Sequence, residues 1–347
     1  MRNRQAELAN LVMTIGDKGL LDIFLSDFWS KVQNSRIPGH GETKVFKFYG
    51  LKVIEIGPNI PCLFGHFVKL MNLRAEQKFD EKLNQTVPSQ ETVDSAPSSF
   101  FLVSLADHKL VFLPESTRRY PTLKDLEYCF EHILHESWVE KRTEARKKLL
   151  EQIGKDRIPK GHAENWRQEL ERLYPQPEVR ITPLPASMDL KKRLELYNLL
   201  TSVHIQPLKT NNELPDENEE FLRQYAKTQK RLGSTSDKIS LSNSKEGLNK
   251  GEAEKFVSRA SNGNYNVKLK GKDKAGRPLV DDLENLKIKV VYSPKKGESS
   301  PEKAVKLLDI LINAIKMNLV SILSAPVPAI EKARELVKKI QGIENGN

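Results

Sequence analysis

The sequence predicts an α+β protein of two domains, each with a mixed or antiparallel sheet packed against helices, followed by C-terminal helices. Three observations support this class. The chain has 347 residues, more than one domain usually contains. Its first part contains long runs rich in Phe, Val, Ile and Leu, typical of strands. Its second part alternates short, half-polar strand patterns with helical patterns, which favours a two-layer sandwich.

The amino-terminal α+β domain is predicted over residues 1–150. The stretches VFKFYGLKVIEI (45–56) and FFLVSLADHKLVFLP (100–114) have strand composition, and residues 106–108 supply a turn within the second. The polar segment 81–99, with Ser and two prolines, is typical of a surface loop or a short disordered insert. A helical stripe with an N-terminal Thr cap, formed by one helix or two, closes the domain; its residues are Thr122, Leu126, Phe130, Leu134 and Trp138.

A helical bridge over 151–177, with an amphipathic helix around Trp166, leads to a basic α/β sandwich domain over 178–296. In that domain strands and helices are predicted in alternation. The expected order is strand 178–185, helix 189–200 capped by Asp189, strand 202–208, helix 216–229, strand 237–243, helix 251–261, strand 265–271 and strand 287–293.

C-terminal helices are predicted over 297–347, joined near Pro326 and Pro328. The first has a wide apolar face, and such a helix is usually buried on more than one side. We therefore expect a homodimer with this helix at or near the interface, the alternative being burial inside the chain itself. The positions concerned are Val305, Leu308, Ile312, Ile315 and Leu319.

Composition narrows the function classes. The first twenty residues lack a long apolar core. We therefore expect no signal peptide and no lipid anchor. The apolar run near residues 310–330 is interrupted by Lys316, Asn318 and prolines, so it is too short to predict a bilayer span. Cys62 and Cys129 are the two cysteines, too few for a disulfide framework or a four-thiolate zinc site. These features predict a cytoplasmic protein without cofactors.

Positive charge is concentrated in one part of the chain. The net charge is +10, and residues 223–296 contain 18 Lys and Arg against 8 Asp and Glu, so the rest is about neutral. A concentrated positive surface is typical of polyanion binding. A basic domain that is merely soluble is the alternative.

The stretch NGNYNVKLKGKDKAGRP (262–278) resembles a phosphate-binding loop, but Gly276 is followed by Arg277 and Pro278 instead of Lys and Ser or Thr. A basic hairpin fits better: Lys268 and Lys270 alternate with Val267 and Leu269, and residues 272–276 form a turn. If the strand at 287–293 is its partner, one face carries four lysines. The predicted nucleic-acid-binding residues are Lys268, Lys270, Lys272, Lys274, Arg277, Lys287, Lys289, Arg231 and Lys238. The alternative is that the lysines protect an edge strand from aggregation.

The order of elements in the second half resembles the C-terminal half of the RexA-like proteins of prophage superinfection exclusion, and a related uncharacterised family of bacterial mobile elements. The nearest match is a strand followed by Lys272, Asp273, Lys274, Ala275 and Gly276. The segment 100–114 with its following helix is similar to the amino-terminal half. The resemblance implies a cytoplasmic homodimer that binds duplex DNA, in preference to RNA, with low sequence specificity and acts in phage exclusion or defence. It also implies a membrane-protein effector partner, without insertion of this chain. A longer amino-terminal domain and an additional C-terminal helix depart from the family.

Enzyme motifs are weak. His132 and His135 have a spacing that can ligate a metal, but neither HExxH nor HxxEH is present. Asp281, Asp282 and Glu284 precede Lys287 at the wrong spacing for a metal nuclease and are typical of a solvated acidic turn. No G-x-S-x-G elbow occurs, and one sequence cannot identify a Ser/His/Asp set that assembles from distant positions. No catalytic or metal-binding residue is predicted; the alternative function is a defence or toxin-type nuclease whose site forms only in three dimensions.

Overall fold

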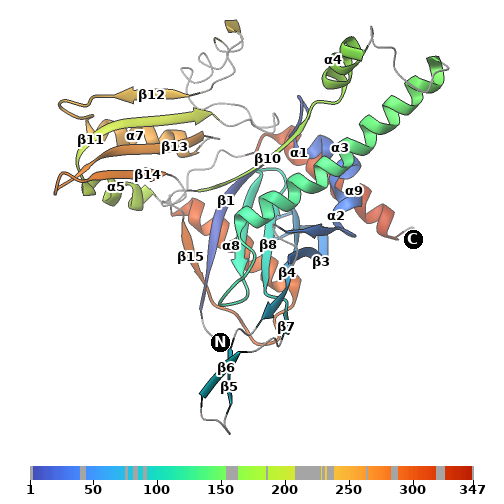
Figure 1. Cartoon of the computed structure of the whole chain (residues 1–347), viewed down its shortest axis with the longest axis horizontal. Coiled ribbons are helices and arrows are strands. Elements are labelled where there is room, and N and C mark those ends of the chain that lie inside the picture. The colour runs from blue at the N-terminus through green and yellow to red at the C-terminus, as the bar shows by residue number, and fades with distance from the viewer. Residues whose placement is uncertain are drawn as a thin grey trace.

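A computed structural model of the chain shows two antiparallel sheets with helices packed against them (Figure 1). It describes residues 3–39, 44–74, 77–80, 85–88, 92–153, 163–184, 187–207, 228, 231–232, 238–262, 265–282, 288–317 and 325–345. The α+β class predicted from the sequence, with C-terminal helices, is confirmed.

The large sheet has nine antiparallel strands, in the order β10-β1-β9-β8-β4-β3-β2, with β15 beside β10 on β1 and β7 beside β8 on β4. A separate pair, β5 with β6, projects from one end of it (Figure 1). The nine strands of the large sheet are β1 (Arg4–Ile15), β2 (Arg36–Pro38), β3 (Lys44–Ile56), β4 (Ile60–Arg74), β7 (Thr92–Ser95), β8 (Ser98–Ser104), β9 (Lys109–Pro114), β10 (Pro177–Pro183) and β15 (Lys289–Tyr292). The separate pair consists of β5 (Gln77–Asp80) and β6 (Gln85–Pro88).

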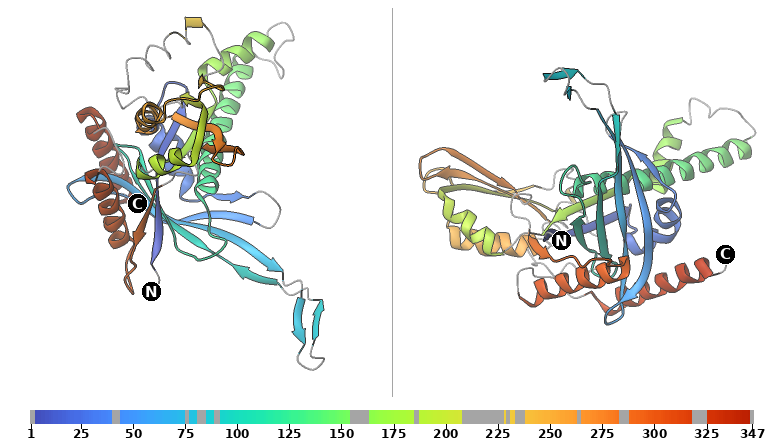
Figure 2. Two further views of the ribbon diagram at one scale, coloured as in Figure 1. Left: turned by 90° about the vertical axis from the view of Figure 1, so that its left-hand side faces the viewer. Right: turned by 90° about the horizontal axis from the view of Figure 1, so that it is seen from below.

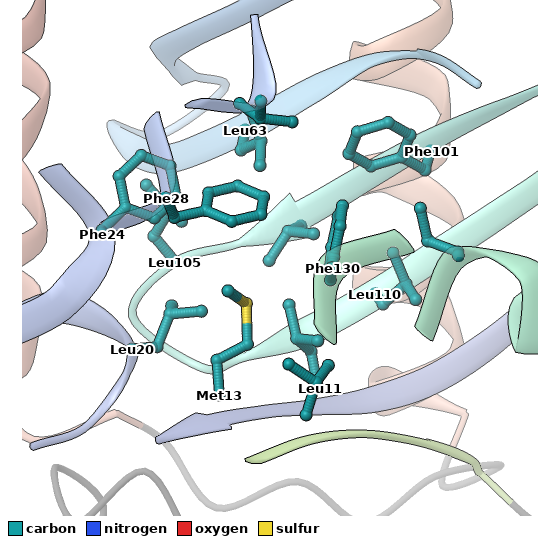
Figure 3. Close-up of a cluster of buried hydrophobic side chains, with 14 of the residues drawn as sticks. Leu11, Met13, Leu20, Phe24, Phe28, Leu63, Phe101, Leu105, Leu110 and Phe130 are labelled. Carbon is teal, nitrogen blue, oxygen red and sulfur yellow. The ribbon is translucent and has the colours of Figure 1, made fainter. Parts of the chain in front are cut away.

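Helices cover both faces of the large sheet, and each face has its own apolar core. In β1, Leu8 belongs to one cluster and Leu11 to the other, because successive side chains of a strand point to opposite faces. The central strands are therefore apolar almost without interruption. The helices of the first core are α1 (Leu20–Ile23), η1 (Phe24–Trp29), α2 (Ser30–Val32), α3 (Leu123–Ile153) and α9 (Val327–Asn345). Figure 3 shows part of this core, with Phe24, Phe28 and Phe130. The helix of the second core is α8 (Ser300–Lys316); Figure 2 shows the helical ribbons from two further sides.

The predicted stripe after Thr122 forms one continuous helix, α3. Thr122 caps it: its Oγ1 accepts the N–H of Asp125 at 3.2 Å, while the Asp125 carboxylate accepts the N–H of Thr122 at 2.8 Å. The predicted bridge helix is α4 (Ala163–Leu173). The indole N–H of Trp138 donates to the carbonyl of Tyr174 at 2.8 Å, which holds the end of α4 against α3.

The small sheet has the order β12-β11-β13-β14. Two helices, α5 (Ser187–Leu196) and α7 (Lys250–Asn262), cover one of its faces around a third apolar core. The sheet lies to one side of the large sheet in Figure 1. Its strands are β11 (Tyr197–Pro207), β12 (Ile239–Ser242), β13 (Tyr265–Asp273) and β14 (Pro278–Asp282).

The two end strands of the predicted second domain, 178–296, belong to the large sheet. The strands at 178–185 and 287–293 exist as β10 and β15, but both pair with β1 of the large sheet. Their local composition predicts a strand without naming its partner, because pairing is decided by distant segments. The small sheet with its helices spans 187–282, and the helices predicted at 297–347 complete the large sheet's cores.

Other elements differ more locally. The central strand β1 and the strand β4 are absent from the prediction, and the polar segment 81–99 contains β6 and β7. The helix predicted at 189–200 ends at Leu196, because Tyr197 begins β11. The helix predicted at 216–229 lies outside the described residues except for residue 228.

The apolar face of α8 is used inside the chain. Leu307, Leu308 and Leu311 are buried in the second core, with Ile312 and Ile315 packed against it, so the alternative of burial within the chain accounts for this face. Val305 is 43% exposed, and Leu319 lies outside the described residues. The homodimer stays a prediction. In the described part of the chain no helix combines the length and apolarity needed to cross a bilayer.

Candidate nucleic-acid interface

The small sheet presents a polar, basic face opposite α5 and α7, here called the outer face. Val267 and Leu269 are buried against the helices, whereas Lys268 and Lys270 between them are exposed. Strand register extends this alternation to neighbouring strands: His204 pairs with both Ser240 and Lys268, and Ser202 with Lys270. The outer face consists of Ser202, His204, Ser240, Ser242, Lys268, Lys270, Lys272, Val280 and Asp282.

The edge-protection interpretation of these lysines is wrong. β13 is an interior strand that pairs with β11 on one side and β14 on the other. Protective lysines act where backbone groups are unpaired at a sheet edge. Lys268 and Lys270 have no such edge to protect, so another explanation of their exposure in the centre of the sheet is needed.

The predicted turn after β13 is confirmed, and Asp273 organises it. Its Oδ1 accepts the N–H groups of Ala275 (2.8 Å) and Arg277 (2.9 Å), and Gly276 takes a positive φ of 77° that favours glycine. The Arg277 guanidinium donates to Asp273 Oδ2 at 2.8 Å. Arg277 therefore has an anionic partner within the turn, whereas Lys274 is exposed at its tip.

The hairpin partner of β13 is β14, so the condition for a face of four lysines, pairing with the strand that carries Lys287 and Lys289, is not met. Lys289 pairs with Glu7 in the large sheet, and Lys287 lies outside the described residues. The expected row of four lysines on two paired strands does not form. Lys238 precedes β12, and its charge acts on His204, which places it beside the outer face. Arg231 is exposed in a helical segment outside the sheet.

A buried polar group fixes β14 from the inner side. Asp281 is 2% exposed; it accepts the Tyr197 hydroxyl at 2.9 Å and pairs with Arg193 Nε at 3.3 Å. The interpretation of Asp281 as part of a solvated acidic turn is therefore wrong, because it lies inside a strand. Nearby, a Cβ on Gly271 would come within 2.2 Å of the Leu199 carbonyl oxygen, so only glycine allows β13 to approach β11 this closely.

His204 lies at the centre of the outer face, where the charges of the neighbouring lysines affect its pKa. Its Nε2 is 3.0 Å from the Ser202 hydroxyl and its Nδ1 2.9 Å from the Ser240 hydroxyl. Partial burial lowers the pKa of His204, and the positive charges of Lys238, Lys270 and Lys268 lower it further. The three ammonium groups thus act together at one point of the face.

Sequence reasoning missed His204, Ser202 and Ser240. Their signal is present in SVHIQ, where Ser202, His204 and Gln206 alternate with buried Val203 and Ile205. What the pattern does not contain is the register that brings His204 opposite Lys268.

Where the structure describes them, the residues of the weak enzyme motifs have separate partners. His132 pairs with Glu136 at 3.3 Å, and the ring of His135 packs against Trp138 at 5.1 Å between centroids. Asp281 and Asp282 point to opposite faces of β14, and Glu284 lies outside the described residues. Across the ranges that the structure describes, no group of three or more His, Cys, Asp or Glu could hold a metal ion.

Neither a comparison with protein-family models nor one with curated proteins finds a match for this chain.

Proposed function

We propose that the protein binds duplex DNA with low sequence specificity, through phosphate contacts from the outer face of the small sheet. The observation that carries the proposal is the exposure of Lys268, Lys270 and Lys272 in a row along an interior strand, beside Lys238. Ammonium groups act as point charges toward phosphates. Such contacts position a protein on DNA without reading its bases.

The residue types on the face favour a duplex over a single strand. Single-stranded nucleic acids are bound mainly by stacking their bases on aromatic side chains. The nine positions that define the outer face include no Phe, Tyr or Trp, and the one ring, His204, is held between two serine hydroxyls. Asp282 is the single acidic residue among them.

The biological setting comes from the sequence resemblance. The resemblance to RexA-like proteins implies that this protein acts in phage exclusion or defence, in the cytoplasm and as a homodimer. A dimer would double the number of basic faces and thereby raise the affinity for one duplex. We adopt this setting as part of the proposal.

The test is a double substitution, Lys268→Ala with Lys270→Ala, assayed by fluorescence anisotropy on unrelated 20-bp duplexes at several salt concentrations. Both side chains are exposed, so folding should survive. We expect weaker binding to every duplex by similar factors, and a slope of log K against log salt that is smaller by about 1.8, from about 0.9 per lost phosphate contact.

The matched control is Lys338→Ala with Lys339→Ala, which removes the same charge from exposed positions of α9. It should leave the slope almost unchanged. Equal losses in both double variants would show that net charge alone attracts DNA and would overturn the assignment of the outer face. Cleavage of the duplex in Mg²⁺, lost in the Lys268/Lys270 variant while binding persists, would instead favour the nuclease alternative.

A further inference from the structure

Three side chains far apart in the sequence form a hydrogen-bonded series on the large sheet. His66 Nδ1 lies 2.8 Å from Glu115 Oε2, and His66 Nε2 lies 3.0 Å from the Ser300 hydroxyl. Carboxylate, imidazole and hydroxyl in this order are the arrangement in which histidine takes a proton from serine.

Each group is placed by a different element. His66 is in β4, Glu115 directly follows β9, and Ser300 is the first residue of α8. The imidazole is fixed from both sides: the Tyr49 ring stacks on it at 4.5 Å, and the Phe100 ring meets it edge-on at 4.9 Å. Its plane is therefore held, as a general base requires.

The surroundings of Glu115 set the proton positions on His66. Burial alone raises the pKa of Glu115, but hydrogen bonds from His66 and Lys303 outweigh it and lower that pKa to about 2. Ser98 donates a further hydrogen bond to Oε2 at 2.9 Å. An ionised carboxylate only accepts, so Nδ1 of His66 carries a hydrogen. In the neutral ring Nε2 then accepts the Ser300 hydroxyl.

A cavity of about 330 Å³ lies beside His66 and Glu115, and the Ser300 hydroxyl is 3.0 Å from the His66 ring on its wall. His66 and Glu115 line it together with three cationic side chains, Arg4, Lys295 and Lys303, of which Lys303 pairs with Glu115. A second acid on its wall, Glu298, is neutralised by Lys306 and accepts the Tyr292 hydroxyl. The cavity therefore suits a small molecule that carries a carboxylate or phosphate group.

We propose that Ser300, His66 and Glu115 form a hydrolytic centre for small anionic carboxylic esters. The Ser300 oxygen bonds to the ester carbonyl carbon while its proton passes to His66 Nε2. The carbon–alkoxy bond then breaks, and the alcohol leaves with that proton. Water, deprotonated by the same nitrogen, attacks the acyl group on Ser300, releases the acid and restores the serine. Glu115 is a positioning residue.

The start of α8 supports the developing charge. The first N–H groups of a helix have no partner within it and carry a partial positive charge. Pro301 has no N–H, and the N–H of Glu302 donates to Ser299. The backbone N–H of Ser300, on the same residue as the reacting hydroxyl, is therefore the helix-end donor that we assign to the developing oxyanion.

Two assays on the full chain test the proposal. A fluorophosphonate probe phosphonylates an activated serine: the Ser oxygen bonds to phosphorus, the phosphorus–fluorine bond breaks and fluoride leaves. Mass spectrometry should find the label on Ser300. Release of nitrophenol should be faster from mono-4-nitrophenyl succinate than from 4-nitrophenyl acetate, because the succinate carries the anionic group.

Both Ser300→Ala and His66→Gln should lower labelling and ester hydrolysis by at least about 100-fold, the usual loss when general base catalysis is removed. Glu115→Gln should lower kcat without raising KM. The control is Ser244→Ala, in an exposed turn of the small-sheet unit, which should change neither rate. Ser300→Ala keeps the Ser299 cap of α8, so it should unfold at the wild-type urea concentration.

A label elsewhere, or equal hydrolysis by wild type and the folded Ser300→Ala variant, would overturn the proposal. The three residues would then serve only to join α8 to the sheet.

Discussion

Replacing Lys109 by methionine tests the energetic cost of a charge buried in the large sheet. Lys109 is only 6% exposed, and its ammonium donates to Asn10 Oδ1 at 2.7 Å. Burial lowers the pKa of Lys109 to about 8, although the negative charge of Asp107 acts in the opposite direction. From an ordinary value of 10.5, the shift corresponds to about 3 kcal/mol of destabilisation at pH 7.

Methionine removes this cost and fills a similar volume, but it takes one hydrogen bond from Asn10, worth about 1 kcal/mol. Lys109→Met should therefore raise the free energy of unfolding at pH 7 by about 1–2 kcal/mol. In the wild type the folded state releases the lysine proton near pH 8, while the unfolded chain keeps it to about 10.5. Wild-type stability from this group thus rises with pH across that window.

Urea unfolding at pH 7, 8, 9 and 10 measures both effects. The advantage of Lys109→Met should shrink as pH rises and vanish near pH 10, where the remaining cost of the lysine has fallen to about 1 kcal/mol and is matched by the hydrogen bond that methionine loses. Lys338→Met, at an exposed position of α9, controls for the loss of one charge. A stability difference that is constant from pH 7 to 10 would refute the reasoning, because it would show that Lys109 has no lowered pKa in the folded state.

Two further predictions concern the small sheet. If phosphates bind the outer face, their negative charge favours protonated His204, whose pKa is lowered in the free protein. DNA affinity, measured by anisotropy titration at fixed salt, should therefore rise as pH falls from 8 to 6. His204→Gln should abolish this rise. Tyr197→Phe should lower the free energy of unfolding by about 1.5–3 kcal/mol, because buried Asp281 loses the hydroxyl donor at 2.9 Å. A change below about 0.5 kcal/mol in urea unfolding would show that the hydroxyl contributes little to Asp281.

Periodicity predicted which side chains of β13 face the solvent, since Lys268 and Lys270 alternate with buried Val267 and Leu269. It could not predict that β13 pairs with β14, because β15 has the same kind of local pattern and its partner, β1, lies almost 300 residues away. β1 itself is buried on both faces, so it lacks the alternation that indicates a half-buried strand.

The series Ser300, His66 and Glu115 has no signal in the sequence. Glu115 is separated from His66 by 49 residues, and Ser300 from His66 by 234. No short motif can carry such a set, because the geometry arises from the packing of α8 on the sheet. The single position that local chemistry predicts is the start of α8, where Ser299 and Glu302 form a capping box before Ser300 begins the helix.

In the described part of the chain, backbone hydrogen bonds next to β10 and β15 mark where the small sheet joins the large one. Leu184, at the end of β10, donates its N–H to the Leu8 carbonyl at 2.8 Å, and Ile288, where the chain returns, donates to the Leu184 carbonyl at 2.9 Å. The chain therefore leaves and re-enters the large sheet at neighbouring backbone positions. The core of the small sheet shares no residue with the two clusters on the large sheet. Because distant substitutions with no shared contacts have independent effects, changes at Lys268 and Lys270 should leave the Ser300 site intact. The DNA-binding proposal and the hydrolytic proposal can thus fail or hold separately.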